Sequence, residues 1–119
     1  MVLVDTSIWV SHLRIGDAHL MYLLREEKVL CHPFIVGELA CGNIVNRREI
    51  LTLLQTLPMA RIVRHEEVLI FIEAHGLMGV GLGLIDVHLL ASALLSHAPM
   101  WTADKRLRQA SARLHVAYP

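Results

Sequence analysis

The stretch Val2-Leu3-Val4-Asp5-Thr6-Ser7-Ile8-Trp9-Val10 opens the chain with an apolar run that leads directly into an acid and two hydroxyls. A short apolar run followed by polar residues is typical of a buried strand. Thr6 or Ser7 can cap a helix that continues through Leu13 and ends at Gly16. Asp5 is therefore expected at the junction between a buried strand and a helix.

The rest of the chain repeats this alternation of short strands and helices. Strands are predicted at Lys28–Cys31, Ile62–Val63, Met100–Trp101 and His115–Tyr118, and helices at 17–24, 33–41, 47–57, 66–75, 86–95 and 105–114. Strands separated by helices favour an α/β fold in which helices cover both faces of a mostly parallel sheet. A length of 119 residues indicates one domain, residues 1–119. The segment Gly79–Gly83 lacks the spacing of a nucleotide-binding loop and is predicted to be a connector.

Bulk composition narrows the possible classes of protein. Eleven basic and eleven acidic residues give no net charge, which argues against a non-specific coat for nucleic acid. Cys31 and Cys41 cannot form a disulfide framework and are expected to be reduced, half-buried thiols. No signal peptide is recognisable, and the apolar segment 77–95 carries Asp86 near its middle, which disfavours a membrane span. A cytoplasmic protein is expected.

Four acids occupy apolar surroundings, where a carboxylate is costly to bury unless a positive charge offsets it. They are Asp5, Glu38, Asp86 and Asp104. Sites in parallel α/β sheets lie beyond the carboxyl ends of the strands, where Asp5 and Asp104 are expected. Oxygen ligands without histidine or cysteine suit Mg²⁺ or Mn²⁺. The pattern therefore predicts a divalent-metal site, for which phosphodiester hydrolysis is the natural use.

Hydroxyl and basic side chains flank these acids. Thr6, Ser7 and Thr102 could orient a carboxylate or a bound water, although each acid and each hydroxyl could equally cap a helix or a turn. Beyond Asp104 the chain contains no acid but four cations, which could contact a phosphate backbone or simply form a solvated helix face. These cations are Lys105, Arg106, Arg108 and Arg113.

Other catalytic classes lack their motifs. The eight histidines contain no H-E-x-x-H and no ligand spacing for zinc. Ser7 and His12 lack the G-x-S-x-G context of a serine hydrolase, and Cys31 lacks the context of a cysteine nucleophile. Trp9 and Trp101 are expected to fill the core.

The order of four segments resembles PIN-domain proteins, specifically the VapC-type toxins of bacterial toxin-antitoxin pairs. These segments are Val2–Ser7, the helix that carries Glu38, Gly83–Ala91 and Trp101–Leu107. The resemblance implies a three-layer α/β/α fold and a Mg²⁺- or Mn²⁺-dependent endoribonuclease that cleaves single-stranded RNA, leaving 3′-hydroxyl and 5′-phosphate ends. It assigns the metal to Asp5, Asp86 and Asp104, gives Glu38 a role in completing the site, and places Thr6 and Thr102 beside the acids. It also implies a homodimer and a VapB-type antitoxin, through which alone operator DNA would be bound.

Two other functions remain open at this point. A phosphoacceptor receiver domain has a similar length, but it needs an acid pair at the first strand and an aspartate in mid-chain, and neither is present. A catalytically silent binding module of the same fold has the same sequence pattern. A phosphatase of the D-x-D kind is disfavoured because Ser7 stands where the second aspartate is needed.

Overall fold

A computed structural model describes the whole chain, residues 1–119. Three short strands and seven helices follow one another along it. The strands are β1 (Val2–Val4), β2 (Val29–Leu30) and β3 (Met100–Trp101), and the helices are α1 (Thr6–Ile15), α2 (Ala18–Arg25), α3 (Pro33–Cys41), α4 (Arg47–Leu54), α5 (His65–His75), α6 (Leu84–Leu95) and α7 (Lys105–Arg113).

The strands form one parallel sheet in the order β2-β1-β3. In its register, Leu3 lies opposite Leu30 on one side and Met100 on the other. β1, at the very start of the chain, is therefore the central strand. Because all three strands are parallel, their carboxyl ends lie at the same edge of the sheet, as the alternation of strands and helices predicts.

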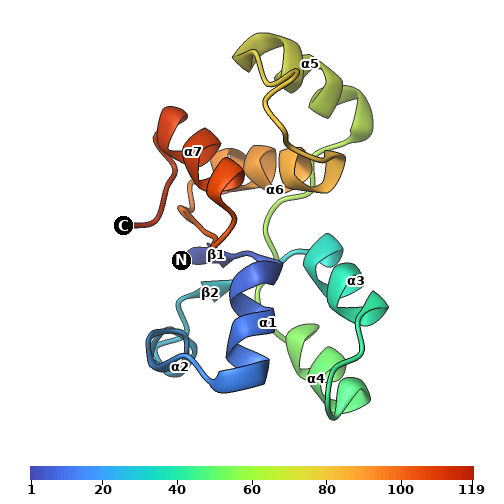
Figure 1. Cartoon of the computed structure of the whole chain (residues 1–119), viewed down its shortest axis with the longest axis vertical. Coiled ribbons are helices and arrows are strands. Elements are labelled where there is room, and N and C mark those ends of the chain that lie inside the picture. The colour runs from blue at the N-terminus through green and yellow to red at the C-terminus, as the bar shows by residue number, and fades with distance from the viewer.

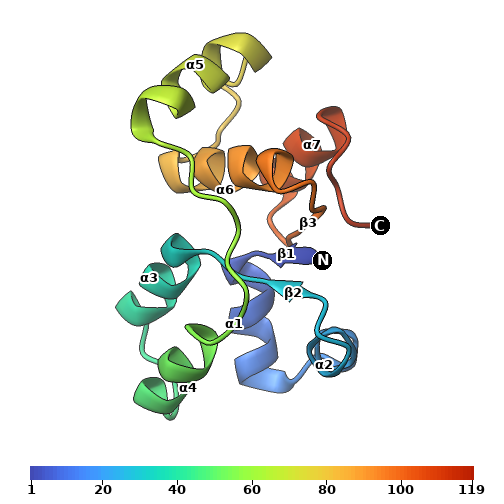
Figure 2. The same ribbon diagram turned by 180° about the vertical axis from the view of Figure 1, so that it is seen from behind.

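Helices cover both faces of this sheet (Figures 1 and 2). α1, α2, α3 and α4 lie on one side, while α5, α6 and α7 lie on the other. α5 extends away from the body of the molecule and packs against α6. The chain therefore has the three-layer α/β/α architecture.

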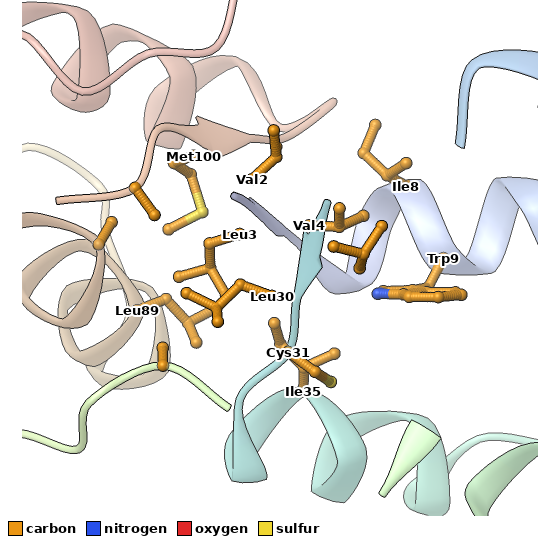
Figure 3. Close-up of a cluster of buried hydrophobic side chains, with 14 of the residues drawn as sticks. Val2, Leu3, Val4, Ile8, Trp9, Leu30, Cys31, Ile35, Leu89 and Met100 are labelled. Carbon is orange, nitrogen blue, oxygen red and sulfur yellow. The ribbon is translucent and has the colours of Figure 1, made fainter. Parts of the chain in front are cut away.

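Two apolar clusters hold these layers together. The larger joins the strands to α1–α4 and to one face of α6, and the smaller joins α5, α6 and α7. Figure 3 shows Leu3 beside Leu89 of α6, whereas Val4 lies on the side of Ile8 and Trp9 of α1. This alternation follows from the two-residue period of a strand, which sends successive side chains to opposite faces.

Polar side chains determine where several helices begin. Asp17 Oδ1 accepts a hydrogen bond from the backbone N–H of Leu20 (2.9 Å) at the start of α2, as the sequence predicts. His32 Nδ1 accepts the N–H of Phe34 (2.9 Å) at the start of α3, and Pro33 occupies the first helical position. The prediction of a helix over 33–41 is confirmed without change of its bounds.

Two predicted strands are wrong. Ile62–Val63 has no strand structure: the chain pairs with the sheet edge only at Met59, which bridges Cys31, and then leaves toward α5. Val63 instead packs into the smaller apolar cluster. His115–Tyr118 is reduced to one bridge between Ala117 and Met100. This C-terminal segment still bonds to β3, since the N–H of Met100 donates to Val116 O (2.7 Å) and the N–H of Tyr118 donates to Met100 O (2.9 Å).

Smaller corrections concern helix ends and thiols. The helix predicted over 47–57 ends at Leu54, and Asp86 is the third residue of α6 rather than its first. The thiols are not half-buried: Cys31 is fully buried and Cys41 is exposed. Trp9 fills the core as expected, whereas Trp101 is only partly buried against it. No helix has the length and apolar character needed to cross a lipid bilayer.

Candidate metal and RNA site

Asp5 lies immediately after β1 and is 94% buried, since only 6% of its surface is exposed. All of its side-chain hydrogen bonds converge on one oxygen. Oδ2 accepts the hydroxyls of Ser7 and Thr102, each at 2.7 Å, and the backbone N–H of Ser7 at 3.4 Å. The other oxygen, Oδ1, has no donor from the protein. Asp5 thus caps α1, which is the purely structural role that the sequence also allows, and it still presents one free oxygen.

Ser7 and Thr102 connect Asp5 to the turn that follows β3. Ser7 Oγ accepts the N–H of Ala103 (3.0 Å), and Thr102 Oγ1 accepts the N–H of Asp104 (3.0 Å). The two hydroxyls are 3.3 Å apart. Because each hydroxyl also donates to Asp5, the first acid and the turn before the last acid are held by the same two side chains.

Asp104 caps α7 with one oxygen, since Oδ1 accepts the N–H of Leu107 at 2.9 Å. Asp86 is the third residue of α6, and its Oδ2 accepts the N–H of Gly83, the residue before the helix, at 3.1 Å. Glu38 lies within α3, and its Oε1 accepts the hydroxyl of Thr6 at 2.6 Å. In each of these three carboxylates the second oxygen has no protein donor.

Electrostatics show that three of the acids lie close together. The pKa of Asp86 is raised above its ordinary value, mainly because burial disfavours the charged form. The hydrogen bond from Gly83 opposes this rise, while the negative charges of Asp5 and Asp104 add to it. Asp86 therefore lies within reach of the charges of Asp5 and Asp104, although the three acids are distant in sequence. The region around these three acids is called the carboxylate pocket below.

The composition of this pocket fits a hard divalent cation. The only ion pair of the chain joins Arg64 and Glu67, so none of the four acids is neutralised by a basic side chain. No three side chains of the kinds that bind metals stand close enough to enclose an ion by themselves. Mg²⁺ commonly keeps several waters and takes only one or two carboxylates directly, so a spaced set of free carboxylate oxygens suits it better than Zn²⁺.

The predicted RNA-contacting residues begin directly beside Asp104. Lys105, Arg106 and Arg108 lie in α7, are exposed, and form no ion pair. The side chain of Arg106 lies against Gly81, where any Cβ would collide with the guanidinium. Gly81 also has φ +83°, a conformation that favours glycine. Gly81 therefore leaves room for the side chain of Arg106, a contact that the sequence did not indicate.

Sequence reasoning also missed a buried histidine network behind α3. His32 is fully buried and its Nε2 lies 3.1 Å from Ser92 Oγ of α6. Burial, together with the charge that His88 can carry, lowers the pKa of His32 to about 4. The neutral ring at physiological pH explains how it can cap α3 with Nδ1. A histidine directly before proline at a helix start was the available signal.

Comparison with known proteins agrees with this architecture. The PIN domain profile matches residues 2–112. Ribonuclease VapC32 of Mycobacterium tuberculosis, from strain CDC 1551 / Oshkosh and from strain ATCC 25618 / H37Rv, is 47% identical over 118 residues, which cover 98% of this chain and 95% of the relative. The chain therefore belongs to the PIN-domain family, and within it to the homologues of the VapC ribonucleases.

Proposed function

We propose that this protein is the ribonuclease toxin of a VapBC-type pair and that its four carboxylates use Mg²⁺ or Mn²⁺ to cleave single-stranded RNA. The observation that supports this proposal is that Asp86 lies within reach of the charges of Asp5 and Asp104, and that each of the three carboxylates keeps one oxygen without a protein donor. Full-length similarity to Ribonuclease VapC32 supports the choice of RNA as substrate.

Each residue has a defined part in this proposal. Asp5, Asp86 and Asp104 hold the ion, and Glu38 completes the site or positions the attacking water. A divalent ion there would supply a water of lowered pKa and offset negative charge on the phosphate. Thr6 fixes the orientation of Glu38, and Thr102 fixes that of Asp5. Lys105, Arg106 and Arg108 contact phosphates, which positions the strand without reading its sequence.

The partners follow from the same assignment. RNA is the substrate, a VapB-type protein is the antitoxin, a homodimer is the assembly, and the cytoplasm is where the RNA would be met. An open apolar groove of about 580 Å³ between α5 and α6 supports a protein partner, because its lining is mostly hydrophobic. All 119 residues form the single domain that carries out this function.

The decisive experiment incubates the purified chain with total RNA, with and without Mg²⁺, and compares wild type with Asp86→Asn. We expect cleavage only by wild type and only with metal. Asp17→Asn is the matched control, since Asp17 is the one aspartate outside the pocket and asparagine preserves a helix cap. This control should cleave like wild type.

A catalytically silent binding module of the same fold would give a different result. It would bind RNA or a partner protein with unchanged affinity after Asp86→Asn and would cleave nothing with any divalent metal. Metal-dependent cleavage that survives Asp86→Asn would point to a contaminating nuclease and would remove the support for this site.

A further inference from the structure

A hollow of about 420 Å³ lies beside the helices that carry Glu38 and Asp86. It lies where α3, α5 and α6 begin, and three of its six lining residues carry aromatic or imidazole rings. The lining residues are Phe34, Val63, His65, Leu84, Ile85 and His88. We call it the ring hollow.

The three rings contact one another, and two of them are exposed. Phe34 and His88 meet edge to face, with centroids 5.0 Å apart and planes at 73°. His65 and His88 are nearly parallel, at 23°, but 6.4 Å apart. Phe34 and His65 are exposed, whereas His88 is almost wholly buried and forms the wall. Exposed rings of this kind are what unpaired nucleobases stack on.

His88 also carries an unmet hydrogen-bonding atom. Its Nδ1 is buried and has no partner in the protein. A buried polar atom without a partner costs free energy that an apolar side chain at this position would avoid. Because this atom is buried, it is not available to a ligand in the ring hollow, and His88 contributes a wall of the hollow rather than a hydrogen-bonding group.

The ring hollow is linked to one of the acids through α3. On α3, Phe34 lies four residues before Glu38, which places both side chains on the same face of the helix, one turn apart. A strand whose phosphate lies at the carboxylates therefore passes the hollow with a neighbouring nucleotide.

We propose that the ring hollow binds one unpaired nucleobase of the RNA strand, next to the phosphate that is cleaved. This inference rests on the proposed ribonuclease function for the identity of the ligand. It adds a reason why the protein prefers single strands: a paired base cannot turn into the hollow. It also names Phe34, His65 and His88 as residues that select the substrate rather than perform the chemistry.

The test uses an oligoribonucleotide that wild type cleaves, with copies in which one nucleotide at a time is abasic. One abasic position beside the cleaved phosphate should lower kcat/KM by about 5- to 150-fold, the effect of losing one stacked base. In the double variant Phe34→Leu/His65→Ala, the intact RNA should be cleaved more slowly by a similar factor. This double variant should cleave the abasic copy almost as fast as the intact RNA, because the stacking between base and rings is already lost.

A matched control and a second readout keep the outcomes separate. Tyr22→Leu/His19→Ala removes another exposed, stacked ring pair, on α2, and should keep full sensitivity to the abasic position. With 2-aminopurine at the sensitive position and EDTA to prevent cleavage, binding should quench fluorescence in wild type but not in Phe34→Leu/His65→Ala.

If Phe34→Leu/His65→Ala cleaves RNA like wild type and keeps its sensitivity to the abasic position, the proposed base binding in the ring hollow is wrong. The proposed ribonuclease function would not be affected. A wild-type chain that cleaves no RNA would overturn both.

Discussion

Thr102 Oγ1 lies 2.7 Å from Asp5 Oδ2, although the two residues are separated by 97 positions in the sequence. The same hydroxyl accepts the backbone N–H of Asp104. One atom at the carboxyl edge of the sheet therefore sets the orientation of the first acid and the position of the last. This arrangement is possible because β1 and β3 are parallel neighbours.

Thr102→Val keeps the shape of this side chain and removes its hydroxyl. We expect unfolding to become easier by about 1–3 kcal/mol, because a buried carboxylate oxygen and a backbone N–H each lose a partner. RNA cleavage at limiting Mg²⁺ should fall about 10- to 100-fold, as is typical when a group that orients a metal ligand is lost. Urea unfolding and cleavage rates measure the two effects. Thr102→Ser, which keeps the hydroxyl, should lie close to wild type, and a fully active Thr102→Val would contradict this role.

Asp86→Asn should separate activity from stability. Asp86 has a raised pKa, so the folded protein binds a proton more tightly than the unfolded chain does. Stability without metal therefore decreases as the pH rises through the pKa of the folded state. Asparagine removes the partly buried charge, and with it the smaller repulsion from Asp5 and Asp104, and can still accept the N–H of Gly83. The variant should melt at a higher temperature than wild type at pH 7 in EDTA, yet lose more than about 100-fold in cleavage. A lower melting temperature would show that the charge of Asp86 does not destabilise the folded protein.

His32 should make the protein less stable in mild acid. The unfolded chain takes up a proton at this ring near pH 6.5, whereas the folded protein does so only near pH 4. The free energy of unfolding should therefore decrease as the pH falls through this window, by about 3 kcal/mol in total. Urea unfolding between pH 4 and 8 measures the slope. His32→Asn can still cap α3 and should be less stable than wild type at pH 7, but its free energy of unfolding should decrease less as the pH falls. An equal slope in both proteins would show that another group causes the pH dependence.

Arg106→Gln should weaken RNA binding by a similar factor for every sequence. If Arg106 contacts one phosphate, the slope of log K against log salt should become shallower by about 0.7, the value for a single strand. Gly81→Ala should change binding in the same direction, because its Cβ would displace the guanidinium. Fluorescence anisotropy over a salt series measures both variants. Arg48→Gln, an exposed change on α4, is the control. If its slope of log K against log salt equals that of Arg106→Gln, the loss of RNA binding does not depend on the position of the removed charge.

Much of the fold could be predicted because capping residues and apolar patterns in the sequence agree with the helices and strands that the tertiary structure contains. Two helix starts are marked in the sequence by Asp17 and Pro33, and one helix stop is marked by Gly76. The structure places all three residues at those helix termini. Met100–Trp101 was predicted as a strand for its apolar character alone and is confirmed. Ile62–Val63 has the same local character but lies where the chain leaves the sheet edge, a position that only the tertiary path determines.

The candidate site was predictable in its acids and less so in its connections. Asp5, Glu38, Asp86 and Asp104 stand out as charges among apolar residues, and their roles remain predictions. Ser7 was noted only as a neighbouring hydroxyl, yet it links Asp5 to the turn at Ala103. That link depends on the pairing of the first and last strands, which no local pattern contains.

The position of β1 has a consequence for synthesis. The ribosome makes residues 2–4 well before their neighbour at residues 100–101. The nascent chain cannot pair β1 with β3, or bring Thr102 to Asp5, until the long segment between them has been translated. Whatever these acids do to nucleic acid, they cannot begin on the messenger being translated before Thr102 has left the ribosome.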